Sequence, residues 1–445
     1  MKRRVMLVHP PLTFEERYGE SAKFTGHIHP PQGLCHLAAM LDPAEFDVAI
    51  LDAQALFMGI DDTAKAIVEY RPDVVGVMTF TVSMHNSAEL MDRVRSVLHD
   101  VPFVFGGPHM TALPEETFRR FPRVELGVVG EGEETFVELL QAIFDKGDLS
   151  KIAGLVWRDQ DGGVHRNSPR AYMKSLDQLP RPAWELLPHL PDTYRPSSMT
   201  YRALPAVAIV TSRGCPFHCA FCDNSVFGRK WRANSPEKVL EWIDHLVETY
   251  GIKDINLQDD HFMVDKKRLA KFCQLFKERH PTLMWSAIGR ADSVDANSVR
   301  LMKEAGCWQI AFGLESGSQR ILDVLHKDET VEEMEMAVRL TKEAGMTVNG
   351  LFMAGCPTED EESLRQTQEF IERLDVDYIS MSAFTPLPNT EIFRRSDEFG
   401  RWEGAGPEDW HKMNLWEPIW IPHGMTKERI KEFVRRAPAK KLQAA

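Results

Sequence analysis

The chain has 445 residues, of which 43% are hydrophobic and 27% charged, and its formal net charge at pH 7 is −13. This length predicts two domains with an appendage, and the acidic balance argues against nucleic acid as a partner. No apolar run approaches the ~20 residues that span a bilayer. The short apolar run at residues 5–8 is stopped by Pro10, so it predicts a strand rather than a signal peptide. Seven cysteines, an odd number, indicate a reducing cytoplasm and a metal site rather than a disulfide framework.

Residues 1–147 alternate short β-branched runs with helical patterns. Strands are expected at 5–8, 47–51, 74–79, 103–105 and 126–129. Helices are expected at roughly 33–42, 61–70, 86–98, 114–121 and 132–146. Such βα units predict a doubly wound, Rossmann-like α/β domain whose parallel sheet is covered on both faces.

Ligands of such sheets bind beyond the carboxyl ends of the strands. Proline, glycine and small polar residues gather there, namely Pro10, Thr81, Ser83, Gly106, Gly107, His109, Thr111, Gly130 and Glu131. Glycines let a backbone approach a ligand closely, and helix N-termini suit phosphates. The residues themselves leave open whether this is a cofactor site or a set of ordinary βα turns.

The stretch 148–203 differs in character from the residues before it. Gly162 and Gly163 predict the turn of a hairpin, and the prolines that follow predict an ordered linker across a domain surface. Beyond it, strands are expected at 206–212, 254–258, 283–288, 309–313, 347–352 and 378–383, with helices between them. The sequence Leu-Met-Lys-Glu-Ala-Gly at 301–306 recurs as Leu-Thr-Lys-Glu-Ala-Gly at 340–345, each a helix end capped by glycine. Residues 204–390 are therefore predicted to form a partial (β/α)6 TIM-type barrel.

A small C-terminal extension, 391–445, carries four tryptophans, which are Trp402, Trp410, Trp416 and Trp420. They are expected to be either plain core or a cap over the barrel mouth.

Three cysteines stand at C-x3-C-x2-C spacing after the first barrel strand, and they are Cys215, Cys219 and Cys222. Three thiolates on one loop can hold an iron–sulfur cluster and leave one iron open. A structural zinc ion would need a fourth ligand, either His218 or a distant residue. Polar residues also follow the other barrel strands, namely Gln258, Asp259, Asp260, Arg290, Glu315 and Ser316. Barrel chemistry occurs at the carboxyl ends of the strands, so a shared site is predicted there.

The cysteine motif, with Phe221 before its third cysteine, resembles that of radical S-adenosylmethionine (SAM) enzymes, and the stretch 313–318 resembles their SAM-contacting strand. The first domain resembles the cobalamin-binding domain of the B12-dependent class, as in methyltransferases and the anaerobic magnesium-protoporphyrin ester cyclase. The resemblance implies that Cys215, Cys219 and Cys222 hold a [4Fe–4S] cluster. It places SAM against Phe221, Gln258, Asp259, Asp260, Arg290, Glu315 and Ser316. It places cobalamin against the nine strand-end residues of the first domain and Gly33.

The resemblance implies reductive SAM cleavage to a 5′-deoxyadenosyl radical, hydrogen abstraction, and methyl transfer from methylcobalamin to an unactivated carbon. The alternatives are a cyclase or ring-rearranging enzyme without methyl transfer, and a corrinoid-free scaffold domain. A small-molecule substrate and a flavodoxin- or ferredoxin-like electron donor are the expected partners, in the cytoplasm. Residues 1–147 lack the Asp-x-His-x-x-Gly motif that supplies a cobalt ligand, so cobalt is expected to have neither a histidine nor its own base as lower ligand.

Overall fold

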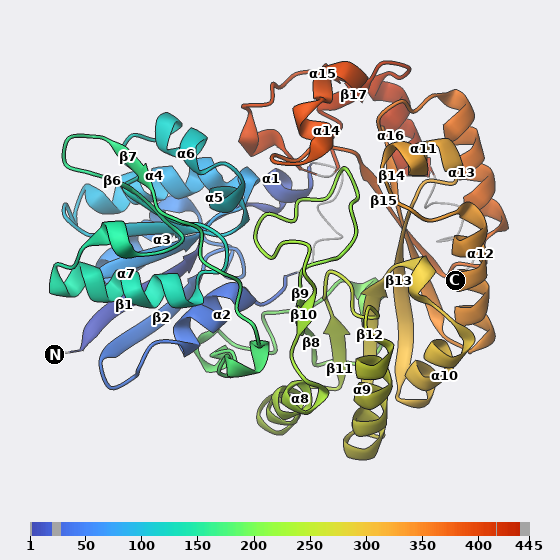
Figure 1. Ribbon diagram of the computed structural model, residues 1–445, viewed down its shortest axis with the longest axis horizontal. Coiled ribbons are helices and arrows are strands. Elements are labelled where there is room, and N and C mark those ends of the chain that lie inside the picture. The colour runs from blue at the N-terminus through green and yellow to red at the C-terminus, as the bar shows by residue number, and fades with distance from the viewer. Residues whose placement is uncertain (1, 20–27, 415, 437–445) are drawn as a thin grey trace.

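The computed structural model describes residues 2–19, 28–414 and 416–436, which form two α/β bodies side by side. Figure 1 shows the N-terminal body at the left, the second body at the right, and the C-terminal segment at the top, over the second body and the junction between the two. This arrangement confirms the predicted fold class. Among the described residues, no helix is both long and apolar enough to cross a bilayer.

The first sheet has the strand order β2-β1-β3-β4-β5-β6-β7. Its first five strands in sequence are parallel, as predicted, and they are β1 (Arg3–His9), β2 (Phe46–Asp52), β3 (Val74–Met78), β4 (Phe103–Gly106) and β5 (Leu126–Val128). The predicted hairpin forms β6 (Leu155–Arg158) and β7 (Val164–Arg166). Because β6 pairs antiparallel with β5, the sheet continues past residue 147, where the first domain was expected to end.

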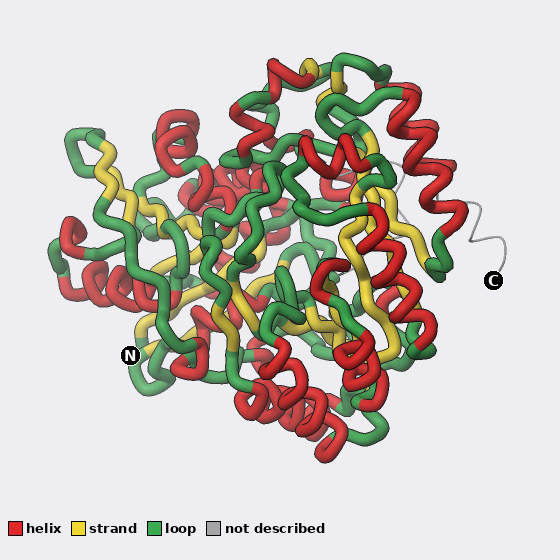
Figure 2. Tube along the Cα trace, turned by 45° about the vertical axis from the view of Figure 1, so that its right-hand side comes forward, coloured by secondary structure: helices red, strands yellow, loops and turns green. Residues whose placement is uncertain are grey.

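Helices cover both faces of this sheet, and in Figure 2 they lie outside the strands. They are α1 (Phe14–Tyr18), α2 (Gln32–Ala39), α3 (Ile60–Tyr70), α4 (Met84–Arg95), α5 (Pro108–Ala112), α6 (Pro114–Arg120) and α7 (Glu133–Asp145). Their apolar stripes bury against β-branched strand residues such as Val5, Val75 and Val104, each at most 2% exposed. The prediction of one helix at 114–121 missed α5, which starts at Pro108 directly after Gly107.

The second sheet has the order β15-β14-β13-β12-β11-β8, all parallel, so neighbours in sequence are neighbours in space. Its strands are β8 (Ala206–Ile209), β11 (Asp254–Leu257), β12 (Met284–Gly289), β13 (Cys307–Glu315), β14 (Thr347–Ala354) and β15 (Tyr378–Ala383). The covering helices are α8 (Pro236–Tyr250), α9 (Lys266–Arg279), α10 (Ala296–Glu304), α11 (Gln319–Val324), α12 (Val331–Glu343) and α13 (Glu361–Arg373). The sheet curls without closing, which makes it the predicted partial barrel.

The open edge of this half-barrel meets the first body. β8 is an edge strand, and such strands expose unpaired backbone groups. The Gln32 side chain, at the start of α2, pairs with that edge: its amide Nε2 donates to Ala208 O at 3.1 Å and its Oε1 accepts from Val210 N at 3.0 Å. One side chain of the first domain therefore replaces part of a missing strand.

The C-terminal segment packs on both bodies through its tryptophans. Trp410 is 1% exposed and joins the core of the first body, with its ring centroid 4.4 Å from that of His109. Trp420 is fully buried beside Phe384 of the second body. Both rings are thus core residues, the first of the two expected roles. The segment contains α14 (Glu391–Arg394), α15 (Ser396–Phe399), β16 (Gly400–Trp402), β17 (Trp420–Pro422) and α16 (Lys427–Arg436), and the predicted extension beyond 436 lies outside the described residues.

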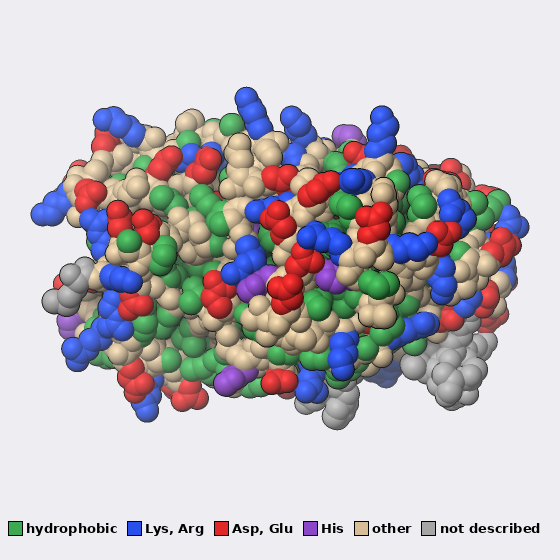
Figure 3. Space-filling model, turned by 90° about the horizontal axis from the view of Figure 1, so that it is seen from below, with side chains coloured by type: hydrophobic (Ala, Val, Ile, Leu, Met, Phe, Trp, Pro, Cys, Tyr) green, Lys and Arg blue, Asp and Glu red, His purple; other side chains and the backbone are tan. Residues whose placement is uncertain are grey.

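Acidic and basic side chains are intermingled on the face drawn in Figure 3. Exposed ion pairs elsewhere on the surface, such as Arg166 with Glu115, contribute little stability individually.

Candidate active site

The three cysteines lie on a loop that is closed at its base by a short hairpin of β9 (Ser212–Arg213) and β10 (Arg232–Ala233). Gly214 opens this cluster loop with φ of 81°, and a Cβ there would lie 2.7 Å from Lys230 O, so the turn requires glycine. Further along, Ala220 N donates to Leu325 O at 2.9 Å. The loop is therefore fixed at its base and at its middle.

The thiols of Cys215, Cys219 and Cys222 suit a cluster better than a single ion. Among the described residues, no three His, Cys, Asp or Glu side chains converge on one metal position. In a [4Fe–4S] cluster each thiolate binds a different iron, so the sulfurs need not converge. Cys215 and Cys219 are half-buried and Cys222 is exposed. Partial removal from water raises the pKa of all three thiols, to about 12 for Cys222, so cluster binding must displace protons.

Asp259 anchors the strand that leads into the cluster loop. Its carboxylate is 1% exposed and accepts hydrogen bonds from Thr211 N at 2.5 Å, Thr211 Oγ1 at 2.7 Å and Ser212 Oγ at 2.6 Å. Both oxygens of Asp259 are thus engaged in the protein. The next residue, Asp260, lies beside the thiols, and burial followed by the charge of Asp259 raises its pKa. Gln258 donates through Nε2 to Asn256 Oδ1.

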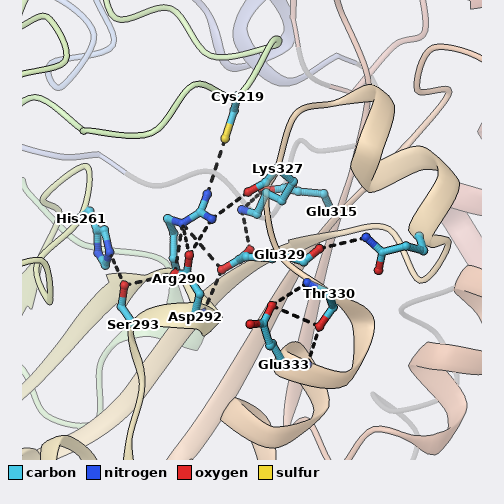
Figure 4. A network of polar contacts seen from close by, with 11 residues as sticks. Cys219, His261, Arg290, Asp292, Ser293, Glu315, Lys327, Glu329, Thr330 and Glu333 are labelled. Carbon is cyan, nitrogen blue, oxygen red and sulfur yellow. Dashed lines mark hydrogen bonds and ion pairs between the residues drawn. The ribbon is translucent and has the colours of Figure 1, made fainter.

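A buried charged network adjoins the loop at the end of β12 (Figure 4). Arg290, 6% exposed, donates through Nη1 to Cys219 Sγ at 3.6 Å and through Nη2 to Asp292 Oδ2 at 2.8 Å and Lys327 O at 2.7 Å. Its guanidinium also stacks over Phe217, with Cζ 3.6 Å from the ring centroid. Arg290 is therefore held rigidly against Cys219, one of the three predicted cluster ligands.

Lys327 and Glu329 complete this network, and sequence reasoning missed both. Lys327 Nζ lies 3.3 Å from Glu315 Oε1 and 3.4 Å from Glu329 Oε2. Burial alone would lower the pKa of Lys327, but Glu315 and Glu329 outweigh it and raise the pKa, so the amine stays charged. The two residues come from an irregular loop after α11, where no strand end marks them.

Glu315 and Ser316 end β13 in an unusual conformation. Glu315 has φ of 61° and follows a register shift in the pairing of β13 with β14, which directs its carboxylate to Lys327. Ser316 is fully buried, and its Oγ contacts Thr367 Oγ1 at 3.0 Å. Phe221 packs at the edge of a cluster of buried apolar residues that includes Ala220 and Cys356.

A cavity of about 270 Å³ lies beyond the carboxyl ends of β3, β4 and β5, between the two bodies. Apolar side chains and glycines form most of its wall. Of the residues expected to contact cobalamin, it brings together Gly33, Gly106, Gly107, Gly130 and Glu131. Ser212, Arg213, Val226 and Phe227 form the opposite wall, so the cavity and the cluster loop share residues.

The other expected cobalamin residues lie outside this wall. His109 is fully buried between Thr117 Oγ1 at 3.0 Å and Thr81 Oγ1 at 3.3 Å, and burial lowers its pKa to about 3, as for a neutral core histidine. Thr111 Oγ1 donates to Gly107 O at 2.9 Å and accepts from Gly130 N at 3.1 Å, so it orients the glycine turns from behind. Ser83 stabilises the turn at Phe80, and Pro10 O accepts from Gln54.

A thiolate loop at the end of a half-barrel, sharing a wall with a glycine-lined cavity of a Rossmann-like sheet, is the arrangement expected of a radical SAM enzyme that also binds a corrinoid. The comparisons with known proteins agree. A model of the B12 binding domain matches residues 23–140, and a model of the Radical SAM superfamily matches residues 209–371.

An uncharacterised methyltransferase of Pyrococcus horikoshii is 34% identical over 443 residues, which cover 98% of this chain and 91% of that protein. The anaerobic magnesium-protoporphyrin IX monomethyl ester cyclase of Rubrivivax gelatinosus is 26% identical, over 97% of this chain and 76% of that protein. The solved radical SAM methyltransferase TsrM of Kitasatospora setae, with cobalamin and a [4Fe–4S] cluster bound, shares the fold with a TM-score of 0.75 at 20% identity, covering 100% of this chain and 89% of that chain. The chain belongs to the cobalamin-dependent radical SAM methyltransferase family, and its cofactors are a [4Fe–4S] cluster, SAM and cobalamin.

Proposed function

We propose that this protein methylates an unactivated carbon of a small-molecule substrate bound between the half-barrel and the first sheet. The observation that carries the proposal is the shared wall: Arg213, Val226 and Phe227 belong to the cluster loop and its base, and they also line the cavity of the first sheet. The radical source and the methyl donor are thereby brought to one place. When bound, the cofactors supply a carbon-centred radical and a methyl group.

The residues of the chain hold and orient these groups. Cys215, Cys219 and Cys222 are proposed to hold three irons of the cluster and leave the fourth for SAM. Asp260 and Glu315 lie near the thiols and suit the amino group and the ribose of SAM, while Phe221 suits its adenine. The half-barrel encloses this end, which protects a reactive radical from water.

Arg290 already has several partners in the protein. Its nitrogens already contact Cys219, Asp292 and the Lys327 carbonyl, so any contact to the SAM carboxylate would be added to a preformed set. Gln258, Asp259 and Ser316 likewise have partners in the protein. We propose that these four residues shape the SAM site mainly by fixing their neighbours.

The cavity of the first sheet is proposed to take the apolar base of the cobalamin tail, because its wall is built mostly from glycines and apolar side chains. The base would then be withdrawn from cobalt, leaving the lower face without a nitrogen ligand. The electron paramagnetic resonance spectrum of the Co(II) form should lack nitrogen splitting. Splitting would contradict this, and His36, which lines the cavity, would then be the residue to change.

The test of the proposed function needs no substrate. Protein reconstituted anaerobically with iron, sulfide and hydroxocobalamin is reduced and given SAM that carries a deuterated methyl group. We expect labelled methylcobalamin and S-adenosylhomocysteine in equal amounts, measured by mass spectrometry. A protein that binds no corrinoid would contradict the proposal. A protein that binds corrinoid but transfers no methyl group would also contradict it, and would favour a cyclase-type reaction like that of the Rubrivivax gelatinosus relative.

A flavodoxin- or ferredoxin-like protein is proposed as the electron donor, and the cytoplasm as the location. The odd number of cysteines, three of them on the cluster loop, supports a reducing compartment. The rate of SAM cleavage with purified flavodoxin and its reductase, compared with a chemical reductant, tests the donor. A negligible rate with both flavodoxin and ferredoxin would contradict the proposal.

A further inference from the structure

Two buried arginines face each other at the base of the cluster loop. Arg213 of β9 and Arg232 of β10 are cross-strand partners in the hairpin, and their side chains are only 8% and 5% exposed. Like charges directly opposite each other destabilise a strand pair, and burial increases the repulsion. The hairpin is therefore not stable by itself; it needs negative charge from elsewhere.

That charge comes from the other body. Glu131, in the turn after β5, and Glu133, the first residue of α7, reach across to the hairpin with side chains 8% and 7% exposed. Glu131 Oε1 lies 3.0 Å from Arg213 Nη1 and 2.9 Å from Arg232 Nη1, and Glu133 Oε1 accepts from Arg213 Nη2. Residues 131, 133, 213 and 232 thus form a neutral buried quartet across the two bodies.

The quartet connects the two cofactor sites. On one side, Arg213 stands two residues before Cys215, and its pairing with Arg232 closes the loop that carries all three cysteines. On the other side, Gly130, Glu131, Gly132 and Glu133 all line the cavity of the first sheet. Glu131 also accepts from Met173 N at 3.1 Å, so its carboxylate has no oxygen left for a ligand. Its carboxylate serves as an ion-pair partner, and the expected contact of Glu131 with cobalamin stays a prediction.

We propose that Glu131, Glu133, Arg213 and Arg232 are positioning residues that couple occupancy of the corrinoid cavity to the closure of the cluster loop. A corrinoid in the cavity packs on the turn 130–133 and fixes both glutamates on the arginines, which keeps the base of the loop closed. By linkage, a bound cluster also strengthens corrinoid binding. The inference rests on the proposed places of the cluster and corrinoid, and not on methyl transfer.

The experiment measures how fast an iron chelator removes the cluster from reconstituted protein, with and without saturating hydroxocobalamin, under anaerobic conditions. Coupling of ordinary size predicts that corrinoid slows cluster loss at least about fivefold in the unchanged protein. In Arg232→Gln the ratio of the rates of cluster loss without and with hydroxocobalamin should fall to nearly one. Absorption spectroscopy should show that this variant still binds one corrinoid. Arg232 suits the test because it is not part of the cavity wall.

Three further variants complete the design. Arg232→Lys keeps the charge and should restore part of the ratio, whereas Glu131→Gln should abolish it and, combined with Arg232→Gln, add little more. Arg166→Gln removes one charge from an exposed ion pair and should behave as the unchanged protein. If the quartet had only a structural role, its variants would lose the cluster faster than the unchanged protein, and by the same factor with and without corrinoid.

Two outcomes would overturn the inference: an unchanged protein in which corrinoid does not slow cluster loss, or an Arg232→Gln protein that keeps the full ratio. If instead the unchanged protein binds no corrinoid or no cluster, the proposed function fails first and this inference with it. Methyl transfer is not measured here, so its failure cannot be mistaken for either result.

Discussion

The parallel strands of the two sheets have different residues beyond their carboxyl ends. At the carboxyl ends of the first sheet the wall is apolar and rich in glycine, and its three charged residues, Glu131, Glu133 and Arg213, are neutralised together with Arg232 behind the wall. At the ends of the second sheet the side chains are charged and buried, with Arg290, Lys327 and Glu329 within one network. Both surfaces follow the rule that α/β ligands bind beyond the strand ends.

The difference matches the two cofactors. A corrinoid with its tail needs volume and close backbone approach, which glycines give. A thiolate-held cluster and a zwitterionic ligand need fixed charges, which are effective only where water is excluded. Two sheets of similar architecture therefore end in different sites, a glycine-lined cavity and a network of buried charges. The following changes should affect one of these two sites and leave the other intact.

The largest effect is expected from Cys219→Ala, because each of the three thiolates is proposed to hold one iron. We expect loss of the cluster and of SAM cleavage, measured by iron content and by the visible spectrum, with corrinoid binding retained. Cys273→Ala is the matched control, since Cys273 is a buried thiol of α9. Normal iron content in Cys219→Ala would refute the assigned ligand.

The converse change is Gly33→Leu in the wall of the cavity. A Cβ at Gly33 meets nothing closer than Met78 Sδ at 3.8 Å, so a small side chain fits and a large one enters the cavity. Overpacking costs about 1–3 kcal/mol, so corrinoid affinity should fall by about 5- to 150-fold. Titration followed by absorption measures it, and Gly33→Ala should bind nearly normally. A simultaneous loss of iron would show that the sites are not separable.

Glu359 tests the burial of charge at the second sheet. It is fully buried after β14, and burial raises its pKa from 4.5 to about 8. The folded protein keeps a proton that the unfolded chain loses, so stability falls as pH rises from about 4.5 to about 8.

Glu359→Gln removes the fall in stability between about pH 4.5 and about pH 8, because the amide does not ionise. It should raise the free energy of unfolding at pH 8 by up to roughly 3 kcal/mol and leave it unchanged at pH 4. Denaturant unfolding at both pH values measures the difference. The control Glu361→Gln removes an exposed carboxylate paired with Arg429 and should give no gain at pH 8. If the two variants had the same free energy of unfolding at pH 8, Glu359 would have to be ionised in the folded protein.

The smallest effect is expected from Arg290→Lys, which keeps the charge but loses the planar fork. Without the N–H contact to Cys219 Sγ the cluster is harder to reduce, because hydrogen bonds to sulfur raise its potential. A redox titration followed by electron paramagnetic resonance should show a lower midpoint potential, with iron content unchanged. An unchanged potential would show that Arg290 acts only on the folding of its loop.

The sequence pointed to the cluster loop because its three cysteines lie within eight residues and their spacing is itself the signal, and their role as cluster ligands stays a prediction. Partners far apart in the chain were not predictable in this way. Glu131 pairs with arginines 82 and 101 positions away, so these ion pairs could not be predicted from the glycine turn around it, and its contact with cobalamin stays a prediction. His109 follows a strand end, and Trp410 of the C-terminal segment packs on its ring. Nothing in the sequence around His109 indicates this contact.

The amide of Gln32 has a consequence for how such a protein can be divided. It satisfies Ala208 and Val210 on the edge strand of the half-barrel, although it belongs to the other body. Cutting the chain between the bodies would expose β8 as a free edge, which invites pairing between copies. The two halves are therefore unsuited to separate expression or to exchange as cassettes between relatives, unless the partner brings its own side chain for that edge.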